Sequence, residues 1–224
     1  MKKIISFSLW GGHPRYLVGA LENAKLRDSI YPEWTCRFYV DSTVPTDTLE
    51  KLTDLGCELV HRPNSMGYRG LFWRFEPGMD DSISRFIVRD ADSRISYREA
   101  DAVEEWEESG QLFHAMRDHR GHDIPVLGGM WGALSNFVPE YKMLFQKYMN
   151  MVDEEPYIKR DKYFYTDQLF LNRVIWPLIK DKAIIHDDLA RFNQNEKPFR
   201  IRLLPGQFIG QQWDEFNKPF EVPQ

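Results

Sequence analysis

The sequence has little cysteine and no long hydrophobic run. Its 224 residues include two cysteines, Cys36 and Cys57, which are not spaced as a CxxC pair. Two thiols in this arrangement make neither a disulfide framework nor a zinc site, so we interpret both as reduced core residues, with a bridge or a reactive thiol as the alternative. No apolar run approaches the roughly 18 residues that a membrane helix requires, and the N-terminal apolar segment is too short for a secretory signal. We therefore expect a cytoplasmic protein with no transmembrane segment.

Basic charge is also scarce. The 29 Lys and Arg residues are outnumbered by 34 Asp and Glu residues, which gives a formal net charge of −5. Duplex nucleic acid is bound by a dense basic face, so this balance argues against a nucleic-acid partner. The apolar fraction of 42% is enough for a hydrophobic core and excludes a wholly disordered chain.

Strand-like and helix-like segments alternate from residue 1 to about residue 190, with no linker, repeat or low-complexity tract. We predict strands at residues 3–10, 37–41, 57–61, 85–88, 111–116, 126–134 and 183–186. We predict helices from residue 14, at 46–55, between Ser96 and Gly110, at 141–151 and at 166–177. The chain is therefore expected to form one α/β domain over residues 1–224, with an irregular C-terminal wrap from about residue 190.

Polar residues follow several of the predicted strands. In open α/β sheets, ligands bind beyond the carboxyl ends of the strands, where loop side chains converge. The polar strand ends are Trp10-Gly11-Gly12, Asp41-Ser42, Asp90-Ala91-Asp92, Arg117-Asp118-His119 and His186-Asp187-Asp188. This edge of the sheet is more polar than folding alone requires, and we place the candidate site there.

Asp90 and Asp92 stand two residues apart at such a strand end. Both side chains can reach one point as the chain turns, and their charge favours a hard divalent cation such as Mn²⁺ or Mg²⁺. Arg89 and Arg94 add positive charge where a diphosphate would lie, and His186 could supply a third metal ligand. In the alternative interpretation, the aspartates pair with these arginines on a solvated turn, and His186 is an ordinary surface or core histidine.

Trp131 and Arg74 also have two interpretations each. Trp131 lies among glycines, so its indole could stack on a sugar or could belong to the core. Arg74 could contact a phosphate, or could form a surface pair with Glu76 or Asp80.

Several segments of the chain resemble the glycosyltransferases of GT-A fold that carry a DxD motif and use a nucleotide-sugar donor. The resemblance extends over nearly the whole chain, and Asp167-Gln168 resembles an element of retaining galactosyl- and glucosyltransferases. The matching segments are 7–12, 68–77, 86–94, 116–119, 128–132 and 166–172. The resemblance implies a Rossmann-like GT-A domain with a mixed, mostly parallel sheet flanked by helices. It further implies a small bacterial or viral enzyme of capsular-polysaccharide or glycan assembly.

The resemblance also implies roles for individual residues. They are metal binding (Asp90, Asp92, His186), contacts with the donor (Ser8, Leu9, Trp10, Asp41, Arg69, Arg74, Asp90, Gly129, Trp131) and catalysis (Asp167, Gln168, Asp118, His119). The metal would be Mn²⁺ or Mg²⁺, and the donor a nucleotide-diphosphate sugar, with uridine diphosphate as the preferred carrier. An inverting enzyme would need a base, for which Asp167, Asp118 or His119 could serve, whereas a retaining enzyme would need none.

The implied reaction moves a hexosyl or deoxyhexosyl group to a glycan or another hydroxyl acceptor. One element of some retaining relatives, the phosphate clamp His-x-x-Gly-x-x-Lys-Pro-Trp, is absent after His186. Two alternatives remain open: a phosphohydrolase of the haloacid dehalogenase type, with Asp90 as nucleophile, and a non-catalytic carbohydrate-binding module. The stereochemistry, the acceptor and the oligomeric state are left open.

Overall fold

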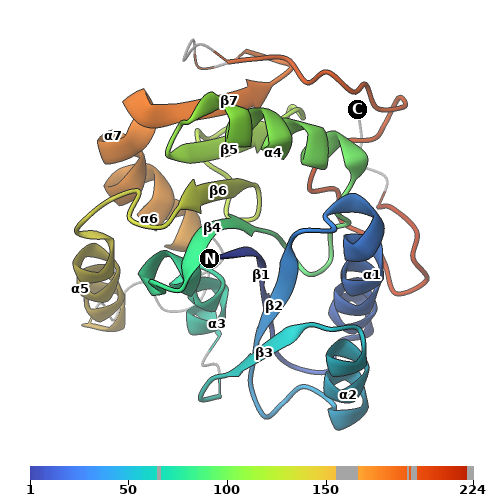
Figure 1. The fold of residues 1–224 in the computed structure, drawn as a ribbon. Coiled ribbons are helices and arrows are strands. Elements are labelled where there is room, and N and C mark those ends of the chain that lie inside the picture. The colour runs from blue at the N-terminus through green and yellow to red at the C-terminus, as the bar shows by residue number, and fades with distance from the viewer. Residues whose placement is uncertain (65–66, 155–165, 191, 193–195, 221–224) are drawn as a thin grey trace.

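The computed structural model describes residues 1–64, 67–154, 166–190, 192 and 196–220 (Figure 1). The strands of this part of the chain are β1 (Lys2–Leu9), β2 (Thr35–Val40), β3 (Glu58–His61), β4 (Ile83–Val88), β5 (Phe113–Arg117), β6 (Trp131–Leu134) and β7 (Ala183–Asp187). The helices are α1 (Pro14–Ile30), α2 (Thr46–Asp54), α3 (Tyr68–Trp73), α4 (Tyr97–Ser109), α5 (Tyr141–Glu154), α6 (Thr166–Phe170) and α7 (Trp176–Ile179). No described helix is long and apolar enough to cross a membrane.

The seven described strands form one sheet in the order β3-β2-β1-β4-β6-β5-β7. Strand β6 runs antiparallel to both β4 and β5, and the other neighbouring strands are parallel. The predicted mixed, mostly parallel sheet is therefore confirmed. Strand order reverses between β1 and β4, and this switch point is where an open α/β sheet leaves a crevice beyond its strand ends.

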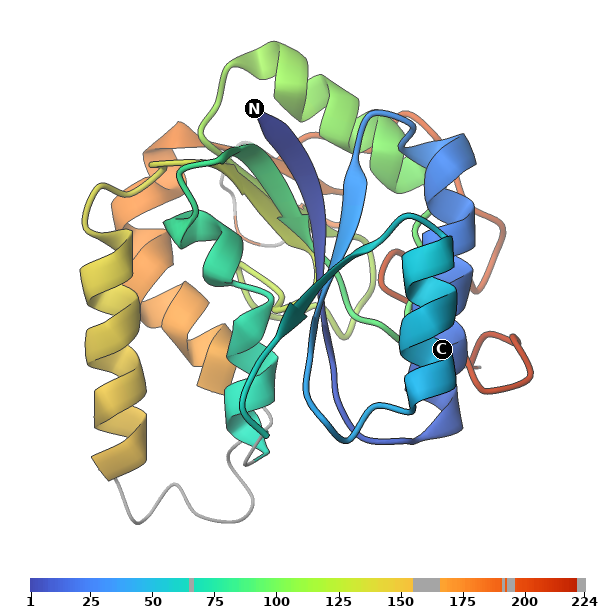
Figure 2. The same cartoon turned by 60° about the horizontal axis from the view of Figure 1, so that its bottom comes forward.

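The sheet separates two hydrophobic layers, because successive residues of a strand point to opposite faces. Ile4 and Phe86 pack in the layer that holds α3, α5, α6 and α7. Their neighbours Ile5 and Ile87 pack in the layer that holds α1, α2 and α4. Figure 2 shows these two groups of helices on opposite sides of the strands.

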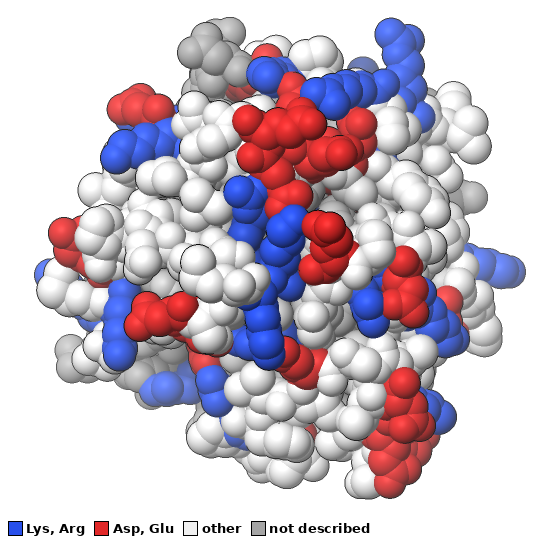
Figure 3. Space-filling model, viewed as in Figure 1, with Lys and Arg blue, Asp and Glu red and all other residues white. Residues whose placement is uncertain are grey.

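Helix α4 begins and ends where the sequence predicts. The Ser96 side chain caps it by accepting the Glu99 backbone N–H, and Gly110 ends it in the left-handed conformation. Acidic side chains gather over α4 near the top of Figure 3, beside Lys and Arg side chains. Glu107 of α4 forms an ion pair with Lys3 of β1 at 3.0 Å. This helix therefore contacts the sheet through an ion pair as well as through its apolar face.

Three expectations about the elements need correction. The segment before β4, for which we predicted neither a strand nor a helix, contains the short helix α3. Strand β6 covers only the last part of the predicted range 126–134. The predicted helix 166–177 is interrupted by a π-helical stretch at Leu171–Ile175. Within the expected C-terminal wrap, residues 191, 193–195 and 221–224 lie outside the described residues.

Candidate active site

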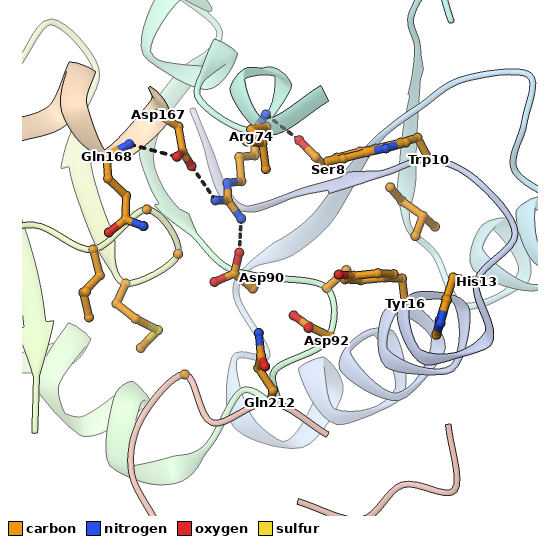
Figure 4. Close-up of a pocket in the computed structure, with 18 of the residues that line it drawn as sticks. Ser8, Trp10, His13, Tyr16, Arg74, Asp90, Asp92, Asp167, Gln168 and Gln212 are labelled. Carbon is orange, nitrogen blue, oxygen red and sulfur yellow. Dashed lines mark hydrogen bonds and ion pairs between the residues drawn. The ribbon is translucent and has the colours of Figure 1, made fainter. Parts of the chain in front are cut away.

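A cavity of about 700 Å³ opens beyond the carboxyl ends of β1 and β4 (Figure 4). Its wall is formed by residues 8–13 at the end of β1, residues 90–92 after β4, the loop 127–130, the start of α6 and the C-terminal segment. Of the predicted site residues, the cavity is lined by Ser8, Leu9, Trp10, Arg74, Asp90, Asp92, Gly129, Asp167 and Gln168. The topology therefore brings together residues from five separated segments.

Arg74 lies at the centre of an aspartate cluster, which we define as Arg74, Asp90, Asp92 and Asp167. Its guanidinium is buried and binds the Asp90 carboxylate through Nη1 and Asp167 Oδ2 through Nη2, at 2.9 Å for the second pair (Figure 4). Burial opposes its charge, but the two carboxylates hold the pKa of Arg74 above its ordinary value. Arg74 is therefore not the surface partner of Glu76 or Asp80.

The backbone of Arg74 is fixed by two serines of β1. Ser8 Oγ accepts the Arg74 N–H at 3.0 Å, and Ser6 Oγ donates to the Arg74 carbonyl at 2.7 Å. Because residues two apart on a strand share a face, both hydroxyls reach the same residue. Ser8 thus positions the aspartate cluster and also lines the cavity.

Gly128 and Gly129 allow the carboxylates to approach the backbone. A Cβ atom on Gly129 would lie 2.0 Å from Asp90 Oδ2, and one on Gly128 would lie 2.7 Å from Asp167 Oδ2. A side chain at either position would displace these carboxylates, so the cluster in this geometry requires glycine at both positions.

The carboxylate of Asp92 is buried and only partly hydrogen-bonded. The residue is 3% exposed, and its Oδ2 atom has no hydrogen-bond partner, although Arg15 Nη2 lies 3.3 Å away. Burial, together with repulsion from Asp90, raises the pKa of Asp92 to about 6. Two neighbouring carboxylates, one with an unsatisfied buried oxygen, are the donor set that a hard divalent cation takes. The residues present therefore fit such an ion.

His186 is not brought to the aspartates. Its Nδ1 lies 2.9 Å from His114 Nε2, and its Nε2 lies 3.2 Å from Glu105 Oε2, so both ring nitrogens are engaged. The ring is 1% exposed, and burial lowers the pKa of His186 despite the attraction of Glu105. The structure gives it the core role that we had left as an alternative. Among the described residues, no group of three His, Cys, Asp or Glu side chains is placed to hold a metal ion.

Trp131 is also a core residue and not a sugar platform. It is fully buried on β6, stacks on Phe113 at 5.4 Å between ring centroids, and meets Phe75 and Phe86 edge to face. The neighbouring Gly128 and Gly129 instead leave room for the carboxylates of Asp167 and Asp90.

Asp118 and His119 lie beside the cavity and hold the C-terminal segment. Asp118 accepts the Ile209 N–H at 3.0 Å and pairs with Arg98 at 3.2 Å, while His119 stacks on Phe208 at 4.3 Å. Burial raises the pKa of Asp118 to about 6. Neither side chain lines the cavity, so we no longer consider them as bases.

Asp41 and Arg69 also lie outside the cavity. Asp41 is buried and accepts the Thr43 backbone N–H at 3.0 Å, and Thr43 Oγ1 accepts the Gly11 N–H at 2.7 Å. Asp41 thereby positions the glycine turn that lines the cavity. Arg69 lines a separate cavity of about 280 Å³ between α3 and α5.

The sequence analysis missed several residues of the wall, among them His13, Tyr16, His122 and Gln212. His13 and Tyr16 belong to the start of α1, directly after the glycine turn, and that position could have indicated them. Gln212 points toward Asp92 in Figure 4. Its neighbour Trp213 donates its backbone N–H to the Asp92 carbonyl at 2.8 Å, a contact that no local pattern announces.

The described sheet, with helices on both faces and one antiparallel strand inside it, is the fold of the GT-A glycosyltransferases. No family model and no curated protein matches the sequence. Among solved structures, the glycosyltransferase GlyE of Streptococcus pneumoniae TIGR4 is similar, with a TM-score of 0.54 and 16% identity over 85% of this chain. Its apo form gives 0.53 and 15% over 82%. The chain spans 46% of the GlyE chain, about half its length, and at this identity the likeness shows the fold alone.

Proposed function

We propose that this chain is a glycosyltransferase that moves a sugar from a nucleotide-diphosphate sugar to a hydroxyl of a glycan acceptor. The observation that carries the proposal is the aspartate cluster at the switch point of the sheet, inside a cavity large enough for such a donor. Uridine diphosphate is the preferred carrier. The likeness to GlyE adds fold-level support.

Asp90 and Asp92 would hold Mn²⁺ or Mg²⁺, and such an ion neutralises charge on a departing diphosphate. The N-terminus of α1 faces the same cavity through His13 and Tyr16, and no acidic side chain stands in its first turn. The positive end of this helix dipole favours an anionic group there. The diphosphate of the donor is therefore proposed to lie between the aspartates and α1.

Asp167 and Gln168 are proposed to face the donor sugar. Gln168 donates its backbone N–H to Asp167 Oδ1 at 2.8 Å, and Arg74 binds the other carboxylate oxygen. Burial raises the pKa of Asp167, and Arg74 counteracts that rise. Arg74 thus acts as a positioning residue that holds Asp90 and Asp167 in one orientation, and the side chain of Gln168 is left to contact the sugar.

A thermal-shift panel of nucleoside diphosphates, with and without Mn²⁺, tests the proposal. One nucleotide is expected to raise the melting temperature by several degrees only when the ion is present. Asp92→Ala should erase this shift. Asp181→Asn, at an exposed position outside the cavity, should retain it. The absence of any response across the panel would contradict the proposal.

Two other outcomes would favour the alternatives. Phosphate release from a generic phosphomonoester, abolished by Asp90→Asn, would indicate a phosphohydrolase. Calorimetric binding of a glycan with no dependence on nucleotide or Mn²⁺ would indicate a carbohydrate-binding module. Release of the nucleoside diphosphate from its sugar conjugate, stimulated by an acceptor, would identify the transferase.

A further inference from the structure

The two cysteines face each other on neighbouring strands. Strands β2 and β3 pair in parallel with Arg37 opposite Glu58, so Cys36 and Cys57, one residue earlier in each segment, are opposite each other. Neighbouring strands lie about 4.8 Å apart, which is inside the range of roughly 4.4–6.8 Å between the Cα atoms of a disulfide. The two thiols are close enough for each to shift the pKa of the other.

The environments of the two thiols differ. Cys36 is 1% exposed in the core that holds Leu52, whereas Cys57 is partly exposed. Arg27 lies close to Cys57, since its Nη2 donates to the carbonyl of Leu55 at 3.4 Å. The neighbouring Cys36 thiol lowers the pKa of Cys57 against the effect of burial, and Arg27 adds to the lowering. The proximity of Cys57, together with burial, raises the pKa of Cys36. Cys57 is therefore the accessible nucleophile, and Cys36 is the buried partner.

We propose that Cys36 and Cys57 form a reversible disulfide when a small-molecule disulfide oxidises them. The Cys57 thiolate attacks one sulfur of the oxidant, which expels one thiolate and leaves a mixed disulfide on Cys57. Cys36 then loses its proton to solvent and attacks Cys57 Sγ, which expels the second thiolate. One oxidant is reduced to two thiols, and two protein thiols become one disulfide.

This inference is independent of the proposed function. The cysteines lie where β2 and β3 begin, and the candidate active site lies beyond the opposite, carboxyl ends of the strands. The bond would connect β3, at the edge of the sheet, to β2 and would close the loop that contains α2. Oxidation is therefore expected to stabilise the fold without changing nucleotide binding.

The test uses the full chain, reduced, desalted and incubated under native conditions with oxidised glutathione. The intact mass after alkylation should show that neither cysteine has been alkylated and that no glutathione is bound. Peptide mapping should link Cys36 to Cys57. Dithiothreitol should restore both thiols, and the oxidised form should unfold at a higher urea concentration. The exchange equilibrium should favour the disulfide at least about tenfold more in native buffer than in denaturing urea.

Single variants separate the two roles. Cys36→Ser should accumulate one stable glutathione adduct on Cys57, because no partner remains to displace it. Cys57→Ser should acquire none under native conditions, since Cys36 is buried. The proposal is overturned if the unmodified chain keeps glutathione on Cys57, if both thiols stay free in excess oxidant, or if the oxidised form unfolds at lower urea.

Discussion

Two groups of buried polar side chains on this sheet differ in their surroundings, and of the two only the aspartate cluster borders the cavity beyond β1 and β4. In the aspartate cluster, Asp92 Oδ2 has no hydrogen-bond partner and Asp90 is 41% exposed at its side chain. In the second group, formed by His114, His186 and Glu105, the three side chains bond one another in a chain. The sequence presents Asp90, Asp92 and His186 alike as polar residues at strand ends, so polarity alone does not distinguish a binding site from a buried polar core.

The hydrogen bonds of the second group engage both ring nitrogens of His186. If His186 donates from Nε2 to Glu105, its Nδ1 accepts from His114 Nε2, and both rings are neutral. Burial lowers the pKa of both histidines, in agreement with this assignment. The aspartate cluster differs physically because it lines the cavity and its Asp90 side chain is partly exposed.

The largest effect is expected from Arg74→Met. This change leaves Asp167 buried without its partner, and the free energy of unfolding should fall by about 3–5 kcal/mol. Adding Asp167→Asn should recover part of the loss, because the unpaired charge is then removed. Urea denaturation of the four members of this double-mutant cycle measures the coupling. Strictly additive effects would show that the pair does not contribute as the structure indicates.

Asp92→Asn is expected to reduce the release of nucleoside diphosphate in the transfer assay by at least about a hundredfold. The melting temperature without ligand should stay the same or rise, because a buried amide replaces a repelled carboxylate. A rate assay checks the expected loss of activity, and thermal denaturation of the same preparation checks the expected melting temperature. A variant that keeps its rate within a few-fold would separate Asp92 from the reaction.

His186→Leu should show the reverse pattern. Loss of the bonds to His114 and Glu105 should lower the free energy of unfolding by roughly 1–3 kcal/mol. Nucleotide binding should be unchanged, since His186 does not line the cavity. The measurements are urea denaturation and the Mn²⁺-dependent thermal shift. If the shift disappears while the fold persists, the histidine belongs to the site after all.

Asp118→Asn should change how stability depends on pH. The pKa of Asp118 is raised to about 6 in the fold, so the folded state binds this proton more tightly than the unfolded state does. The contribution of protonated Asp118 to the free energy of unfolding is thus fully present below about pH 4, and it is lost as the pH rises through about 6. The stability of the unmodified chain relative to the variant should fall by roughly 1–2 kcal/mol over that range. Urea titrations at both ends measure it, with Asp181→Asn as the control; an equal slope in both chains would contradict the raised pKa.

Local patterns predicted most of the elements. The apolar runs of β1, β2 and β4, the capping of α4 by Ser96 and the stop at Gly110 depend on neighbouring residues only, and each is confirmed. The helix predicted at 166–177 was less accurate, because its π-helical stretch is not marked by any pattern that we used.

The sequence predicted the part of the candidate site that lies directly at strand ends beside the switch point of the sheet. Asp90 and Asp92 follow β4 at the switch point, and they line the cavity as expected. Trp131 and Asp118 were misjudged, because a side chain at a strand end can face the cavity, the core or another loop. That choice depends on register and on what packs opposite.

The sequence by itself determined the alternation of strands and helices, the two-sided core and the pair of carboxylates that follows β4, because these depend on residues that are neighbours along the chain. Only the tertiary structure decided that Arg74 joins Asp90 to Asp167, that His186 is engaged by Glu105, and that Trp213 bonds the Asp92 carbonyl. These contacts join residues far apart in sequence, and they exist only once the sheet order and the path of the C-terminal segment are set.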